Sequence, residues 1–91
     1  MTKQNKAQAL KRLKKIEGQV VGLSRMIQQD RYCIEILTQI SSIHEALRGV
    51  GKVVMRNYLE TCATSALRSK SKEKAEQIYS EFMDALYRFA K

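Results

Sequence analysis

The longest uninterrupted apolar periodicity in the chain begins at Cys33 and continues, at spacings of three and four, to Cys62. No proline and no strong turn signal interrupts it before Ser69-Lys70-Ser71, so it predicts one helix of about 36 residues. That length is about three times the mean for globular helices, and a monomer cannot cover the apolar face of such a helix. We therefore expect this helix to pack on a partner.

Two shorter amphipathic patterns flank the long helix. Apolar spacing predicts a first helix over roughly residues 6–28, and Asp30 is the expected N-cap of the long helix. A third pattern, from Ala75 to Phe89, predicts a short helix with Ser71 as its cap. The 91 residues are enough for one domain and not for two, so we expect a single all-α domain over residues 1–91.

The two cysteines are placed so that they can meet only between chains. Cys33 and Cys62 lie 29 positions apart, which at about 100° per residue gives eight turns and roughly 20°. Both thiols therefore share one face of the predicted helix but lie roughly 43 Å apart along its axis. Two such helices that pair antiparallel about a twofold axis near Leu47 and Arg48 would set Cys33 beside the partner's Cys62.

Gly49 and Gly51 lie next to that midpoint, where missing side chains would let two backbones cross closely. The alternative is that both cysteines are buried packing residues. If the cysteines form a reactive pair, we expect Cys33 to be the more nucleophilic thiol. It falls in the first turn of the long helix and lies beside Arg31, and a helix N-terminus and a nearby cation both favour the thiolate. Cys62 lacks this help, so we expect an attacking Cys33 and a resolving Cys62.

The charge balance indicates a polyanionic partner. The chain has 17 Lys+Arg against 9 Asp+Glu, a net charge of +8. No apolar run is long enough to span a bilayer and no signal peptide is evident, so we expect a cytoplasmic protein that binds nucleic acid and no membrane. Residues 1–16 carry six basic side chains and no acidic one, and Arg48, Lys52 and Arg56 form a cationic ridge spaced by four.

Three segments resemble motifs of the CsoR/RcnR family of bacterial transcriptional repressors: Arg12–Gly22, Arg31–Ile40 and Asn57–Cys62. The resemblance covers almost the whole chain. It implies a three-helix protomer with one very long central helix, an antiparallel homodimer with a four-helix-bundle core, and a flat tetramer of two dimers. It also implies a repressor that binds double-stranded operator DNA without a helix-turn-helix and leaves it when an inducer reaches the cysteines. The residues expected to contact DNA are Arg12, Lys15 and Arg48, with Lys11, Lys14 and Lys52 as auxiliaries.

One departure from the family pattern concerns the inducer. Copper sensors of the family carry a histidine four positions before the second cysteine, where this chain has Tyr58, a poor ligand for Cu(I). The single histidine, His44, lies about 16 Å along the helix axis from Cys33, and we expect it at an interface or on the surface. The pattern of two cysteines without that histidine resembles the CstR-like branch of the family, in which a persulfide converts the two thiols into an intersubunit di-, tri- or tetrasulfide. Tyr32 and Tyr58 would then lie near this sensing site.

The sequence therefore predicts a repressor of sulfide-detoxification genes that responds to a small reactive-sulfur inducer and holds no metal and no cofactor. The alternative in the same fold is a Cu(I)-responsive repressor of copper-efflux genes. A third possibility is a small thiol enzyme or a nonspecific basic nucleoid protein. We expect no enzyme, because no acid/base partner is visible near Cys33.

Overall fold

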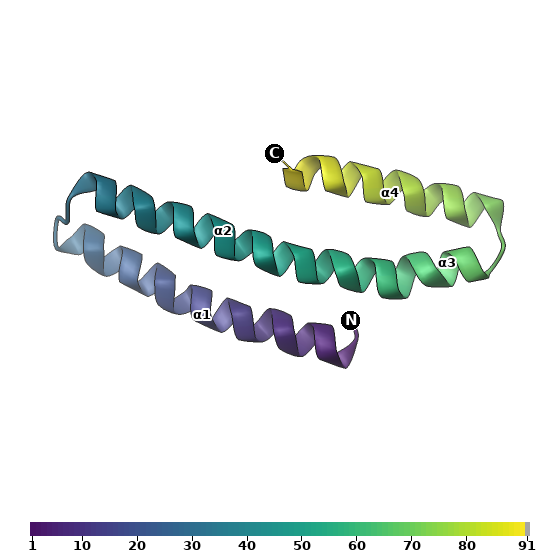
Figure 1. Cartoon of the computed structure of the whole chain (residues 1–91), viewed down its shortest axis with the longest axis horizontal. Coiled ribbons are helices and arrows are strands. Elements are labelled where there is room, and N and C mark those ends of the chain that lie inside the picture. Colours follow the sequence, from purple (N-terminus) through teal and green to yellow (C-terminus); the bar gives the residue numbers. More distant parts are fainter. Residues whose placement is uncertain (91) are drawn as a thin grey trace.

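The computed structural model describes residues 1–90 as a chain of helices, α1 (Lys3–Gln28), α2 (Cys33–Tyr58), α3 (Thr64–Arg68) and α4 (Lys72–Ala90). A π-helical turn, η1 (Leu59–Ala63), joins α2 to α3 without a break. Together α2, η1 and α3 form one continuous rod over residues 33–68, which confirms the length predicted from the periodicity (Figure 1).

Side-chain hydrogen bonds cap α1 and α4, and two helix starts differ from the predictions. Thr2 caps α1 by accepting a hydrogen bond from the Asn5 amide at 3.1 Å, so α1 begins earlier than predicted. Ser71 caps α4 through the Lys74 amide, as predicted. Asp30 is not the cap of α2, because its backbone has φ 51° and belongs to the reversal between α1 and α2, a conformation that aspartate tolerates. Tyr32 takes the N-cap position without a side-chain bond.

The helices form a single layer. α1 runs back along one edge of the rod and α4 runs back along the opposite edge (Figure 1). The Cα trace measures 58 × 27 × 12 Å, and its smallest extent leaves no room for a second layer of helices, whose axes would lie about 8–10 Å from those of the first. None of the described helices has an apolar stretch long enough to cross a membrane.

Such a layer has almost no interior. Within residues 1–90 the buried hydrophobic side chains are Ala9, Ile16, Ile43, Val53 and Ala63. Many large apolar side chains remain exposed on the broad faces, including Leu37 at 58% and Leu47 at 45%. An apolar surface of this kind needs a cover, which supports the expectation that the protomer packs on a second copy.

The two glycines at the middle of the rod serve contacts within the chain. A Cβ at Gly49 would lie 2.9 Å from Arg12 Nη1 of α1, and a Cβ at Gly51 would overlap the ring of Phe89 of α4. The prediction that these glycines let two rods cross closely concerns two copies of the chain and stays a prediction. Their missing side chains make room for α1 on one edge and α4 on the other.

Candidate functional site

The two thiols lie at opposite ends of the rod. Cys33 is the first residue of α2 and Cys62 lies in η1, and both are free and exposed. Neither cysteine is therefore a packing residue within the protomer, and the alternative that they are buried in packing stays open for an assembly of protomers. A single chain does not bring them together, as the spacing predicts (Figure 1).

Cys62 occupies an irregular part of the helix. The Thr64 amide donates to the Leu59 carbonyl five residues earlier, which is the π-helical pattern. Thr61 and Thr64 support the wide turn, since their hydroxyls donate at 2.8 Å to the carbonyls of Asn57 and Leu59. A wider turn rotates each residue by a smaller angle, so the rotation of roughly 20° between the two cysteines, which assumed a regular α-helix, does not hold. Single π-turns in long helices are frequent at functional sites.

An open pocket of about 350 Å³ adjoins Cys62 on the side of α4. Its lining is mostly polar and includes Ser65, Ser69, Lys74 and Glu81. The Thr61 hydroxyl oxygen lies 3.6 Å from the sulfur of Cys62. The sulfur is therefore accessible to a small reagent and has a hydroxyl group beside it.

Tyr58 lies one turn before Cys62 and is engaged by α4. Its hydroxyl donates to Glu81 Oε2 at 3.0 Å and lies 3.4 Å from the Ile78 carbonyl, and its ring stacks on Phe82 with centroids 6.2 Å apart. Burial raises the pKa of the Tyr58 phenol above its ordinary value, and the hydrogen bond and charge of Glu81 and the charge of Cys62 add to this. Tyr58 therefore stays a neutral hydrogen-bond donor, which is not the form that binds a metal ion.

Cys33 has fewer neighbours. Tyr32 beside it is 70% exposed. Arg31, the cation expected to favour the thiolate of Cys33, instead pairs with Glu35 at 2.9 Å and donates to the same carboxylate through Nε. The advantage expected for Cys33 therefore rests on its place at the start of α2, not on a free cation.

The basic residues of α1 and α2 meet in a groove between the two helices. One pocket of about 310 Å³ is lined by Gln8, Arg12, Gly49, Lys52, Val53 and Arg56. A second, of about 330 Å³, is lined by Arg12, Lys15, Ile16, Gln19, Ser42, Glu45 and Ala46. Arg12 belongs to both, so the structure brings three of the expected DNA-contact residues, Arg12, Lys15 and Lys52, to one groove. Lys11 and Lys14 are exposed on α1.

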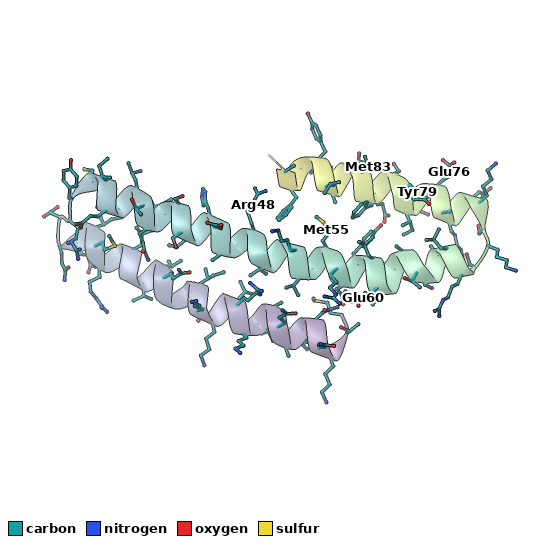
Figure 2. All side chains as sticks on the ribbon, viewed as in Figure 1. Arg48, Met55, Glu60, Glu76, Tyr79 and Met83 are labelled. Atoms are coloured by element: carbon teal, nitrogen blue, oxygen red, sulfur yellow. The ribbon has the colours of Figure 1, made fainter. Side chains whose placement is uncertain are left out.

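Arg48 lies on the other side of the rod. Its guanidinium sits 5.4 Å from the centroid of the Phe89 ring, a cation–π contact with α4 (Figure 2). A spacing of four residues adds about 40° of rotation at each step, so Arg48 and Arg56 do not share one face. Arg56 moreover pairs with Glu60 at 3.6 Å. The predicted continuous ridge is therefore wrong in this protomer.

Three further residues complete the description. His44 is exposed on α2, in keeping with the predicted surface position. Asn5 and Asn57 were not predicted as a pair, and they are 5% and 8% exposed and hydrogen-bonded to each other across α1 and α2. An asparagine within an apolar helical pattern is the signal that could have indicated Asn57.

Comparison with known proteins gives consistent results. A family model described as "Metal-sensitive transcriptional repressor" matches residues 5–88. The copper-sensing transcriptional repressor CsoR of Bacillus subtilis is 38% identical over 86 residues, covering 94% of this chain and 82% of that protein. The copper-sensing transcriptional repressor RicR of Mycobacterium tuberculosis is 47% identical over 64 residues, covering 70% and 67%.

Two solved structures share the fold over almost the whole chain. The crystal structure of the copper-sensing repressor CsoR with Cu(I) from Geobacillus thermodenitrificans superposes with a TM-score of 0.85 at 43% identity, covering 100% of this chain and 92% of that one. The nickel-responsive transcriptional regulator InrS superposes with a TM-score of 0.75 at 30% identity, covering 98% and 93%.

Proposed function

This chain belongs to the family of metal-sensitive transcriptional repressors, and from that premise we propose that Cu(I) is its inducer. In this proposal Cys33 of one protomer and the partner's Cys62 bind the metal ion, and the complex then leaves its operator. The observation that carries the proposal is the pair of free, exposed thiols on a fold that matches a Cu(I)-bound CsoR along its full length.

The chemistry of the donors fits this inducer. Thiolates are soft ligands and select Cu(I) over harder cations. The relatives named copper-sensing therefore favour Cu(I) as inducer over the persulfide that the tyrosine at position 58 predicts. Two thiolates suffice to hold the ion, because Cu(I) accepts low coordination numbers, and Tyr58 is not needed as a ligand.

The proposal requires a dimer. The rod holds its two thiols at opposite ends, so only antiparallel pairing of two rods unites Cys33 with the partner's Cys62. The exposed apolar side chains of the rod, such as Leu37 and Leu47, supply surface that such a pairing would bury. Pairing of two dimers into a flat tetramer follows from the same resemblance and stays part of the proposal.

For operator DNA we propose the groove between α1 and α2. Arg12, Lys15 and Lys52 face a common space there, and lysine and arginine side chains bind phosphate oxygens of the duplex without reading its sequence. Lys11 and Lys14 would extend the contact along α1. Arg48 would add to it only from the opposite edge of its own rod.

A persulfide is the second candidate inducer, and the engagement of Tyr58 by Glu81 favours it. Persulfide sensing needs two thiols and no third ligand. Cys33 would attack the outer sulfur of a persulfide and release a thiol, which leaves a persulfide on Cys33. The partner's Cys62 would then displace hydrosulfide from it and close an intersubunit disulfide, so that the sulfur chemistry needs no further oxidant.

One experiment separates the two inducers. Duplexes that the purified reduced protein selects from a random pool serve as operator, and fluorescence anisotropy follows their release. We expect Cu(I), added anaerobically at one equivalent per protomer, to release the DNA. Release by cysteine persulfide without release by Cu(I), together with a covalent dimer in the intact mass, would overturn the copper proposal in favour of the second candidate.

A further inference from the structure

A buried pair of asparagines fastens the first turn of α1 to the sensing end of the rod. Asn57 Oδ1 accepts hydrogen bonds from the Thr2 amide at 2.9 Å and from Asn5 Nδ2 at 3.2 Å. Asn5 and Asn57 are 5% and 8% exposed, so breaking these bonds while the two helices stay packed would leave buried polar groups unpaired, which is unfavourable. The start of α1 therefore moves with Asn57.

The same residue is joined to the sensing thiol. The Asn57 carbonyl accepts the Thr61 hydroxyl at 2.8 Å, and that hydroxyl oxygen lies 3.6 Å from the sulfur of Cys62. Thr61 and Cys62 are consecutive residues of η1. A displacement of Cys62 therefore moves Thr61, its covalent neighbour, and the hydrogen bond from the Thr61 hydroxyl carries this movement to the Asn57 carbonyl.

Glu60 extends the connection to the groove. Its Oε1 accepts from Asn5 Nδ2 at 2.9 Å, and its Oε2 pairs with Arg56 Nε at 3.6 Å. Arg56 lines the groove beside Arg12. Figure 2 shows Glu60 on the side of the rod that faces the start of α1.

From these contacts we propose that Asn57 is the positioning residue that transmits inducer binding at Cys62 to the DNA-contact helix α1. The inference rests on the proposed function, and it names the path by which the sensing site regulates the groove. When an inducer draws Cys62 toward the partner's Cys33, the π-turn changes its hydrogen-bond pattern. Thr61 then shifts the Asn57 carbonyl, and the Asn57 side chain shifts the first turn of α1. A π-turn suits this role because the regular α-helical pattern is a discrete alternative to it.

The test uses Thr61→Val in the 91-residue chain, a substitution that removes the hydroxyl with little change in volume. Thr38→Val is the matched variant, since Thr38 makes the same kind of bond, to the Ile34 carbonyl at 2.8 Å, far from Cys62. Three quantities are measured for each: Cu(I) affinity by chelator competition, operator affinity with and without Cu(I), and hydrogen exchange of the amides of residues 2–6. We expect Thr61→Val to bind free operator as the parent does, and the measured Cu(I) affinity of each protein sets the concentration at which its sites are saturated. The ratio of operator affinities without and with Cu(I) should fall about tenfold, and Cu(I) should no longer speed exchange at residues 2–6.

A second arm does not depend on copper. In a Cys33→Ser background iodoacetamide modifies Cys62 alone, and exchange at residues 2–6 should then rise with Thr61 present and stay unchanged in Thr61→Val. Asn57→Ala, compared with Gln39→Ala, which loses another bond between α2 and α1, should show fast exchange at residues 2–6 before any treatment.

The outcomes separate the two proposals. If Cu(I) fails to release operator from the parent protein, the proposed inducer is wrong, while the alkylation arm still decides the role of Asn57. If Thr61→Val and Thr38→Val behave alike in both arms, the transmission through Asn57 is overturned.

Discussion

Tyr58 donates a hydrogen bond of 3.0 Å to Glu81, and this contact joins the sensing end of the rod to α4. Tyr58 stands at the position where copper sensors of the family carry a histidine. The contact therefore has two consequences, one for stability at high pH and one for metal affinity.

The pH dependence follows from the raised pKa of Tyr58, which burial and Glu81 produce. Below pH 10.0, the ordinary phenol value, Tyr58 is neutral in the folded and unfolded chains and its contribution to stability is complete. Above that pH the unfolded chain ionises first, so the contribution is lost as pH rises. We expect the melting temperature to fall more steeply above pH 10 in the parent than in Tyr58→Phe. Tyr79→Phe, at a 61% exposed position, should retain the parent's dependence.

Replacing Tyr58 by histidine should raise Cu(I) affinity about tenfold or more, because an imidazole nitrogen adds a ligand to the two thiolates. Competition against a chromophoric Cu(I) chelator measures the change. Tyr58→Phe, which adds no donor, should leave the affinity as it is. Equal affinities for the histidine and phenylalanine variants would show that position 58 does not reach the metal ion.

The two cysteines should be required for different steps of the response to the inducer. Cys33→Ser should abolish both Cu(I)-driven release and any persulfide-driven cross-link, because the residue at the start of α2 is the expected attacking thiol. Cys62→Ser should still allow a sulfur adduct on Cys33 but no covalent dimer. Non-reducing gels and intact mass after treatment with cysteine persulfide distinguish these products. A cross-linked dimer from the Cys33→Ser protein would reverse the assignment of attacker and resolver.

Arg12→Ala should weaken operator binding and reduce the dependence of log Kd on log salt concentration by about one phosphate contact. Arg48→Ala should have the smaller effect on DNA, since its guanidinium rests on Phe89. Arg31→Ala removes a cation that is already paired with Glu35 and should leave the salt dependence unchanged. Anisotropy titrations over a salt series measure all three. An unchanged salt dependence for Arg12→Ala would remove Arg12 from the DNA-contact residues.

Gly51→Ala should destabilise the protein by about 1–3 kcal/mol, because the new Cβ overlaps the Phe89 ring and displaces α4. Gly18→Ala is the comparison, since no atom lies within 4 Å of a Cβ there. In that open helical position alanine should stabilise by roughly 0.5–1 kcal/mol. Urea denaturation at one fixed protein concentration gives both values. A stable Gly51→Ala protein would mean that α4 does not pack there.

Some features of the candidate site were predictable because they are local. The positions of Cys33 and Cys62 toward opposite ends of one helix follow from an apolar pattern without proline, and that pattern predicted the length of the rod as about 36 residues. The Ser71 cap depends on a hydroxyl and an amide three residues apart. The motifs that carry the family resemblance are likewise contiguous in the chain. In these cases the physical cause lies within a few turns of backbone.

What only the tertiary structure decided is which helix each side chain faces. Arg12 rests against Gly49 in the groove while Arg48 turns to Phe89, although both were predicted to contact the same operator DNA. The bonds from Asn57 to the first turn of α1 join residues 52 and 55 positions apart, and they form only because α1 folds back along the rod. A periodic pattern specifies that a helix has an apolar face, but the partner of each residue depends on how separate helices pack, and no local signal encodes that choice.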